Sequence, residues 1–113
     1  MDNCLFCAIC NKTVDSMILY EDDVLIAIRD ISPQAPFHIL IIPKEHIDSA
    51  AELTEAHGPM LAAVHMLAAK LCAQEGYTNG YRVVTNIGPD GAQTVQHLHF
   101  HILAGRQLGW PPG

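Results

Sequence analysis

The stretch that decides the fold is residues 97–103, which read His97-Leu98-His99-Phe100-His101-Ile102-Leu103. Histidines alternate with apolar residues, and this period of two is typical of a half-buried β-strand. The three histidines are therefore predicted to share one face, while the apolar residues between them face a core. One histidine on a strand is usually an ordinary surface residue. Three in register, close to the Gly-containing segment 88–91, indicate a functional site.

The spacing of the histidines limits what they can bind. A strand rises about 3.3 Å per residue, so the Cα atoms of His97 and His101 would lie roughly 13 Å apart, and each about 6.5 Å from His99. Neighbours at this spacing can share a ligand, but three such side chains do not easily chelate one ion with short Zn–N bonds. The row is predicted to contact an extended group, such as a phosphate with its leaving group. A metal site built from all three histidines is the second interpretation.

The rest of the chain predicts an α+β fold, with an antiparallel sheet of about five strands and one long helix. Turn residues and prolines separate the apolar segments. A single domain is expected to span residues 1–113. The predicted elements are a short N-terminal helix at 4–10, strands at 15–20, 24–29, 38–42, 81–86 and 97–103, and the long helix at about 57–75, which Gly76 ends.

Composition excludes several classes of function. The 113 residues are 50% hydrophobic and carry a net charge of −6, which argues against nonspecific binding to nucleic acid or anionic membranes. No apolar run approaches the roughly 20 residues of a membrane span, and Met1–Asn3 does not begin a signal peptide. We therefore expect a cytoplasmic protein. In that compartment the four cysteines indicate metal or redox chemistry rather than structural disulfides.

The pattern His-φ-His-φ-His-φ-φ, where φ is apolar, resembles the signature of the histidine triad family. Other segments are similar to the Hint branch of that family, the purine nucleoside phosphoramidases. Leu98 disfavours the related uridylyltransferases, which have proline at this position. The segments that carry the resemblance are Asp30-Ile31-Ser32-Pro33-Gln34-Ala35-Pro36, Ile42-Pro43-Lys44, Asn86, Asp90-Gly91 and Gly109-Trp110-Pro111-Pro112-Gly113.

The chemistry of such an enzyme can be worked out from the residues. A neutral imidazole nitrogen can attack phosphorus if an acceptor holds its other ring nitrogen in the correct tautomer. His99 has a histidine on each side and is the predicted nucleophile, as the resemblance also implies. His101 is placed to contact the phosphate or assist the leaving group. By family analogy His38 supports this cluster; otherwise it is a polar residue at a strand end.

The resemblance also implies a purine nucleotide site. Asp30 could accept hydrogen bonds from both ribose hydroxyls, as acidic residues do in other nucleotide sites. Gln93 and Thr94 resemble a Gln and a Ser that contact the phosphate or leaving group, and Asn86 serves the same region. From the sequence alone, the residues implied for the wall around the base would pass as ordinary core: Phe6, Ile9, Ile31 and Leu40.

A zinc site is the second implied centre. Cys4 and Cys7 supply two ligands at a standard spacing, and His46 and His97 could complete a tetrahedron. Several bacterial members of the family bind zinc this way; the alternative is a set of small buried thiols. Such a zinc would be structural, because four protein ligands leave no position for water. The remaining candidates are Cys10, which is spare or a competing ligand, Cys72, expected in the core, and His57 and His65, expected to be structural.

The resemblance implies a homodimer that pairs long helices and edge strands, with the tail around Trp110 reaching the partner's site. The leading hypothesis is a hydrolase of purine nucleoside 5′-phosphoramidates that acts through a nucleotidyl-His99 intermediate, and it needs no metal for catalysis. Three alternatives stay open: a dinucleoside polyphosphate hydrolase of the same fold, a non-catalytic nucleotide-binding regulator, and a zinc-dependent hydrolase that uses the histidine row.

Overall fold

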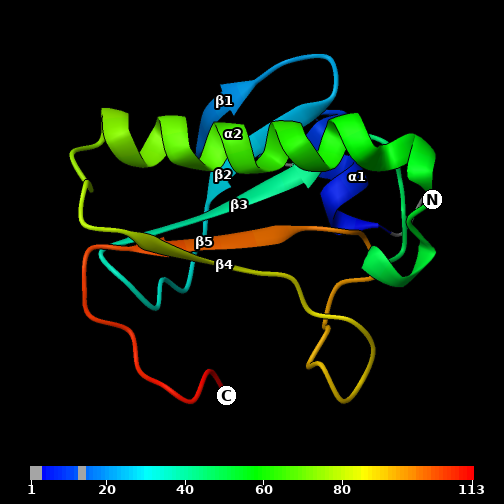
Figure 1. Cartoon of the computed structure of the whole chain (residues 1–113). Coiled ribbons are helices and arrows are strands. Elements are labelled where there is room, and N and C mark those ends of the chain that lie inside the picture. The colour runs from blue at the N-terminus through cyan, green and yellow to red at the C-terminus, as the bar shows by residue number, and fades with distance from the viewer. Residues whose placement is uncertain (1–3, 13–14) are drawn as a thin grey trace.

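A five-stranded antiparallel sheet runs through the molecule in the order β1-β2-β3-β5-β4, as Figure 1 shows. The predicted α+β class and antiparallel sheet are confirmed. The computed structural model describes residues 4–12 and 15–113; Met1–Asn3, used above to exclude a signal peptide, lies outside them. The elements are α1 (Leu5–Cys10), β1 (Ile18–Glu21), β2 (Leu25–Arg29), β3 (Phe37–Pro43), the 3₁₀ turns η1 (Ala50–Glu52) and η2 (Glu55–His57), α2 (Gly58–Gln74), β4 (Tyr81–Val84) and β5 (Phe100–Ala104).

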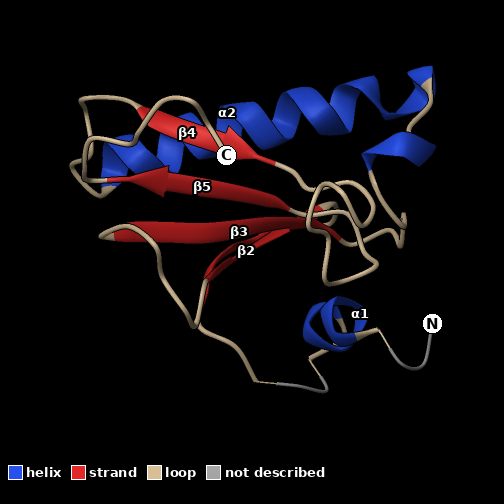
Figure 2. Ribbon diagram, turned by 90° about the horizontal axis from the view of Figure 1, so that it is seen from below, coloured by secondary structure: helices blue, strands red, loops and turns tan. Residues whose placement is uncertain are grey.

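Strand β3 is the centre of the sheet. All seven of its residues are buried, and it pairs with β2 on one side and β5 on the other. A strand buried on both faces needs a cover on each face. Figure 2 shows these covers: α2 lies along one face, and α1 lies against the other.

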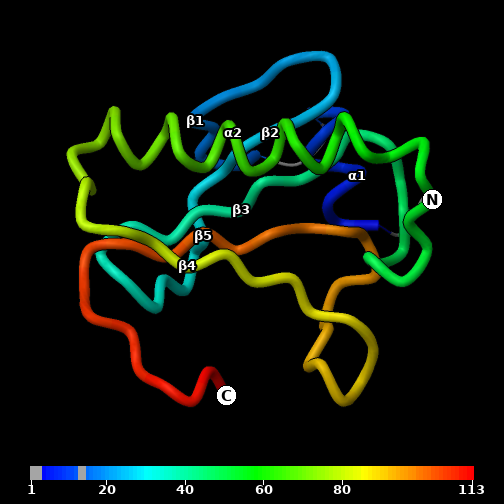
Figure 3. The backbone as a smooth tube through the Cα atoms, in the orientation of Figure 1, coloured from blue at the N-terminus to red at the C-terminus, as the bar shows by residue number. Residues whose placement is uncertain are grey.

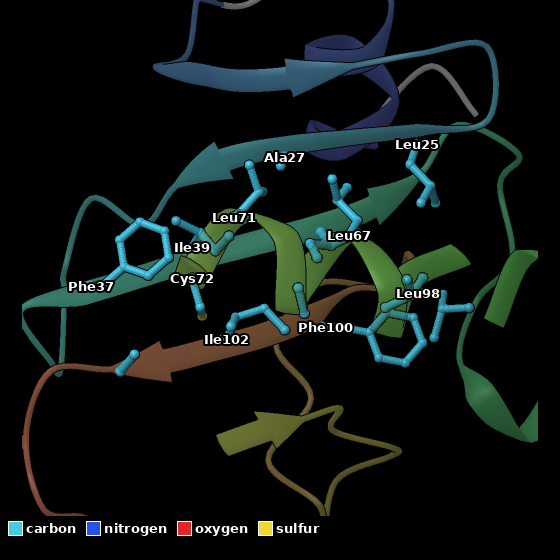
Figure 4. Close-up of a cluster of buried hydrophobic side chains, with 14 of the residues drawn as sticks. Leu25, Ala27, Phe37, Ile39, Leu67, Leu71, Cys72, Leu98, Phe100 and Ile102 are labelled. Carbon is cyan, nitrogen blue, oxygen red and sulfur yellow. The ribbon is translucent and has the colours of Figure 1, made fainter. Parts of the chain in front are cut away.

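The larger core lies between the sheet and α2, where apolar residues at helical spacing pack on alternate strand residues. Pro59 occupies the first turn of α2, and the chain leaves the helix at Gly76 with φ +85°, which favours glycine. Cys72 is buried in this core, as predicted. Figure 4 shows the cluster, with Leu67, Leu71 and Cys72 of α2 against Ile39, Phe100 and Ile102 of the sheet.

A smaller core fills the other face of the sheet. Phe6 and Ile9 of α1 pack against alternate residues of β2 and β3, namely Ile26, Ile28, Leu40 and Ile42. The backbone N–H of Cys7 donates to the Cys4 sulfur at 3.3 Å, which caps the start of α1. This second core was not predicted, although the uninterrupted apolar run of β3 indicated it.

The prediction that all of 97–103 forms a strand is wrong at its start. β5 begins at Phe100, because Leu98 donates its N–H to the carbonyl of Ile47 at 2.6 Å and the chain bends away from β3 there. Leu98 still faces the larger core, together with Phe100 and Ile102. Two histidines thus precede the paired strand, which frees them to point at different partners.

Smaller differences concern the other ends and the loops. β1 begins at Ile18 rather than at residue 15, and β4 ends at Val84 rather than at residue 86. The turns η1 and η2 were not predicted. The His57 ring accepts a hydrogen bond from the Thr54 N–H at 3.0 Å, which fits its expected structural role, while His65 is exposed on α2. Within residues 4–12 and 15–113, no helix has the length and apolarity to cross a membrane.

Candidate functional site

A cavity of about 610 Å³ lies on the α1 side of the sheet, a size that suits a nucleotide-sized ligand. The two buried or half-buried histidines His99 and His101 form part of its lining. Figures 2 and 3 show that α1 and the connection from β4 to β5 lie at the same end of the sheet. Residues of both segments line the cavity. The cavity therefore draws on α1, β2, β3, β5 and the connection that precedes β5.

The hydrogen bonds of His99 assign its tautomer. Its Nδ1 lies 2.7 Å from the backbone carbonyl oxygen of His97, and a carbonyl can only accept, so Nδ1 carries the proton. The ring is buried and meets Phe6 edge to face, with centroids 4.8 Å apart. Burial lowers the pKa of His99, partly offset by the bond to the carbonyl, so the ring is neutral at pH 7. Its Nε2 consequently keeps a lone pair on the cavity side.

A chain of hydrogen bonds assigns the other two rings. The backbone N–H of Gln34 donates to Nδ1 of His38 at 3.0 Å, so the proton of neutral His38 is on Nε2. That Nε2–H donates to Nδ1 of His101 at 2.9 Å, which places the His101 proton on its own Nε2. Burial, with the neighbouring His99 and His38, lowers the pKa of His101 to about 4. His101 is therefore a neutral hydrogen-bond donor at pH 7.

Asp30 stands beside this chain. One carboxylate oxygen, Oδ2, lies 3.4 Å from His38 Nε2 and 3.9 Å from His101 Nδ1, and the other accepts from the Ser32 N–H at 2.8 Å. The three side chains are close enough to hold an ion. However, both ring nitrogens of His38 are already committed, one as acceptor and one as donor. The hydrogen bonds from Gln34 through His38 thus keep His101 in one tautomer, and the Asp30 carboxylate lies beside them.

Seven of the eight other residues predicted for the nucleotide site line the cavity: Phe6, Ile9, Asp30, Ile31, Leu40, Asn86 and Thr94. Gln93 does not. Its amide oxygen accepts from the Gly88 N–H, and its amide nitrogen donates to the carbonyls of Asp48 and Val95. In this structure Gln93 holds the loop that borders the cavity.

Several lining residues were missed from the sequence: Leu5, Asp15, Ser16, Ile28, Ala92 and Val95. The signal for Ile28 was available, because it alternates with core residues on β2 and must face the opposite side. Asp15 and Ser16 carried no pattern of their own, because they precede a short strand and look like ordinary connecting residues.

The second cluster is formed by Cys4, Cys7, His46 and His97, the predicted zinc ligands. Their ligand atoms all lie within 4.8 Å of one another. The Cys4 and Cys7 sulfurs are 3.3 and 3.4 Å from Nδ1 of His97, and the Cys7 sulfur is 3.2 Å from Nδ1 of His46. A tetrahedral zinc with bonds of about 2.3 Å to sulfur and about 2.0 Å to nitrogen would separate its ligands by about 3.5 Å. The four side chains therefore fit such an ion.

The outer contacts of the two histidines turn the correct nitrogens inward. His97 Nε2 lies 2.7 Å from the Pro43 carbonyl oxygen, and His46 Nε2 lies 2.8 Å from a carboxylate oxygen of Asp48. Both Nε2 atoms thus carry protons, and both Nδ1 lone pairs face the cysteines. Burial and the neighbouring Cys4 thiol raise the pKa of Cys7 to about 11. A bound cation would stabilise the thiolate and so lower this pKa again.

Comparisons with known proteins give the family of this chain. The family model for scavenger mRNA decapping enzyme C-terminal binding matches residues 3–109. An uncharacterised HIT-like protein of Synechococcus elongatus is 47% identical over 112 residues, which cover 99% of this chain and 98% of that protein. The chain belongs to the histidine triad family. The resemblance of residues 97–103 to the signature of this family is therefore confirmed.

Further relatives carry more specific names. A 14 kDa zinc-binding protein of Zea mays is 47% identical over 111 residues, covering 96% of this chain and 87% of that protein. An adenylylsulfatase of Arabidopsis thaliana is 41% identical over 111 residues, covering 96% and 76%.

Solved structures share the fold. A histidine triad hydrolase of Legionella pneumophila has a TM-score of 0.95 and 45% identity, covering 98% of this chain and 100% of that one. A zinc-bound family member of Mycobacterium smegmatis has a TM-score of 0.81 and 30% identity, covering 99% and 81%.

Proposed function

We propose that this protein is a Hint-like hydrolase that cleaves purine nucleoside 5′-phosphoramidates through a nucleotidyl-His99 intermediate. The observation that carries the proposal is the tautomer of His99. Its Nδ1–H is held by the His97 carbonyl at 2.7 Å, so the Nε2 lone pair is free in a cavity that suits a nucleotide. A neutral, oriented imidazole is the form of histidine that can attack phosphorus.

In the first step Nε2 of His99 forms a bond to phosphorus, and the phosphorus–nitrogen bond breaks. The leaving nitrogen accepts a hydrogen bond from Nε2–H of His101, and a proton from water completes the amine. In the second step a water oxygen bonds to phosphorus and releases a proton, and the bond to His99 breaks. The net reaction converts the phosphoramidate and water into the nucleoside monophosphate and an amine, and the imidazole is regenerated.

The remaining cavity residues suit the rest of the substrate. Asp30, adjacent to His101, can accept hydrogen bonds from the two ribose hydroxyls. The apolar side chains of Phe6, Ile9 and Ile31 offer a surface on which a flat base can pack. Ile31 is 97% exposed, and covering it with a purine removes apolar surface from water.

The proposed route is tested by acid-quenched mass spectrometry of the intact protein after mixing with adenosine 5′-phosphoramidate. We expect a covalent adduct with the mass of an adenylyl group, and peptide mapping should place it on His99. Complete turnover without an adduct at any quench time would point to direct attack by water. Binding of AMP without turnover of any phosphoramidate would favour the nucleotide-binding regulator.

Hydrolysis of adenylyl sulfate is a second candidate, because the Arabidopsis relative bears the name adenylylsulfatase. The same nucleotidyl-His99 would form, with sulfate as the leaving group in place of an amine. Sulfate needs no proton to leave, so this substrate should depend less on His101. Comparing kcat for the two substrates in a His101→Ala variant separates the two functions.

His38 is proposed as a positioning residue that acts through His101. Replacing His38 by alanine removes the donor that fixes Nδ1 of His101, and we expect kcat to fall by about 10- to 100-fold, as for other outer-shell partners. His38→Gln keeps an N–H donor at a similar place and should recover most of the rate. Equal losses in the two variants, measured by steady-state kinetics on phosphoramidate, would contradict this role.

We also propose that Cys4, Cys7, His46 and His97 hold a structural zinc ion. When bound, the ion would link the start of α1 to the segments that follow β3 and precede β5. No step of the proposed reaction uses it, because His97 turns its Nδ1 toward the cysteines and away from the phosphate.

A homodimer is proposed as the working form. Two features support it: β4 lies at an edge of the sheet, and the outer surface of α2 exposes Met66, 71% of which is open to solvent. The tail is held by a hydrogen bond from Arg82 to the Gly109 carbonyl at 2.8 Å, and Trp110 beyond it is 82% exposed. Such an aromatic side chain is suited to a partner subunit.

Met66→Glu should convert the dimer to a monomer, because it places a charged carboxylate on the face of α2 that is proposed to pack against the partner. Sedimentation analysis should give twice the chain mass for the wild type and the chain mass for the variant. Met17→Glu, an equally drastic change at an exposed position beside the other edge of the sheet, should leave the dimer intact. A wild type that sediments as a monomer would refute the proposal.

A further inference from the structure

We propose that the Asp15 carboxylate accepts hydrogen bonds from the base of the nucleotide and makes this protein prefer guanine over adenine. The inference rests on the proposed function and names the substrate class of the same site. Asp15 lines the cavity but belongs to neither the triad nor the segments that identify the family.

The order of groups along the cavity places Asp15 at the base end. The phosphate belongs at His99 and His101, and Asp30 follows, 3.9 Å from His101. The chain before β1 runs antiparallel to the end of β2, where the Arg29 N–H donates to the Met17 carbonyl at 3.0 Å. Asp15 therefore lies beside the segment that follows Asp30, and both segments line the same cavity. A nucleotide with its ribose at Asp30 extends its base toward Asp15.

The Asp15 carboxylate has no ion pair or hydrogen bond to any residue that the structure describes. Among the described lining residues one is basic, Arg29, and its guanidinium contacts groups on the other face of the sheet. It lies 3.6 Å from a Glu75 carboxylate oxygen and 5.8 Å from the centre of the Phe37 ring, in the larger core. The negative charge of Asp15 is thus available to a ligand, at the border of an otherwise apolar wall.

The chemistry of the purine edges selects the base. Guanine presents two adjacent donors, N1–H and the 2-amino group, which match the two oxygens of a carboxylate. Hypoxanthine keeps N1–H but lacks the amino group. Adenine has one donor, the 6-amino group, beside the N1 lone pair, which a carboxylate repels. The expected order of affinity is therefore GMP, then IMP, then AMP.

Calorimetric titration of the full-length protein with GMP, IMP and AMP tests the inference without any turnover. We expect the wild type to bind GMP about tenfold more tightly than AMP, with IMP between them. Asp15→Ala should bring the three dissociation constants within about twofold of each other. Asp15→Asn should favour AMP, because an amide can accept from the 6-amino group and donate to N1.

Asp23→Ala is the matched control, since Asp23 is an exposed carboxylate in the β1–β2 turn and outside the cavity lining. It should keep the wild-type order. Equal affinities for GMP and AMP in the wild type, or an order of affinity unchanged by Asp15→Ala, would overturn the inference. Neither result would bear on the proposed hydrolysis of phosphoramidates. A GMP preference that depends on Asp15, in a protein that turns over no phosphoramidate, would support it and refute the proposed function alone.

Discussion

Replacing His99 by alanine is expected to lower kcat/KM for an adenosine 5′-phosphoramidate by about 10⁴-fold or more. Of the two histidine rings among the described lining residues, the variant loses the one whose Nε2 lone pair is open in the cavity, since Nε2 of His101 carries a proton in the hydrogen-bonded chain. The covalent adduct should disappear in the same variant. Steady-state kinetics and acid-quenched mass spectrometry measure the two effects.

The fold should survive this change, so the loss can be assigned to chemistry. The His99 ring makes one hydrogen bond, to the His97 carbonyl, and edge contacts with Phe6 and His101. AMP should still bind to the variant because Asp30 and the apolar wall remain. His65→Ala, at an exposed position on α2, is the control and should keep full activity. If His99→Ala retained more than about a tenth of the wild-type rate, another group or water would be the nucleophile.

The alternation of residues 97–103 predicted correctly which side chains face the core, because a period of two separates the two faces of a strand. Leu98, Phe100 and Ile102 enter the larger core as the period of two requires. The pattern could not predict that His97 and His99 would precede the paired strand. That outcome depends on the contact between Leu98 and Ile47, which are far apart in sequence, and tertiary contacts of this kind override local periodicity.

The sequence also could not predict the tautomers of His99 and His101. Whether His99 exposes Nε2 or Nδ1 depends on a backbone carbonyl, and the tautomer of His101 depends, through His38, on the backbone amide of Gln34 in a loop. The register that pairs Leu40 with His101 brings His38 next to the triad. A list of residue types does not contain this register, so His38 could be assigned only by resemblance.

The members of the Cys/His cluster, in contrast, were all predicted from the sequence and the resemblance. Spacing alone predicted Cys4 and Cys7 as metal ligands, because a Cys-x-x-Cys pair on a helical turn can place both sulfurs on one side. His46 and His97 lie far along the chain, yet the fold brings Nδ1 of His97 within 3.3 and 3.4 Å of the two sulfurs and Nδ1 of His46 within 3.2 Å of the Cys7 sulfur. These contacts support the proposed zinc site, because outer partners turn the Nδ1 atoms of both histidines toward the cysteines.

Removing the proposed zinc ion is expected to lower stability before activity. Cys7→Ser, or prolonged chelation, should abolish binding of the proposed zinc ion and lower the melting temperature by about 10 °C or more, because metal binding energy is also folding energy. Below the new melting temperature, kcat for the phosphoramidate should stay within about threefold of the wild type, since neither His99 nor His101 is a ligand. Elemental analysis, calorimetry and kinetics measure the three quantities.

Cys10→Ser is the matched control for that experiment. Cys10 lies on α1 three residues beyond Cys7, but it is not one of the four residues whose ligand atoms meet. The control should therefore keep its zinc and its melting temperature. If Cys10→Ser lost the metal, Cys10 would be the ligand in place of Cys4 or Cys7. If chelation stopped turnover while the fold remained intact, the ion would be catalytic, and the zinc-dependent hydrolase would replace the metal-independent route through His99.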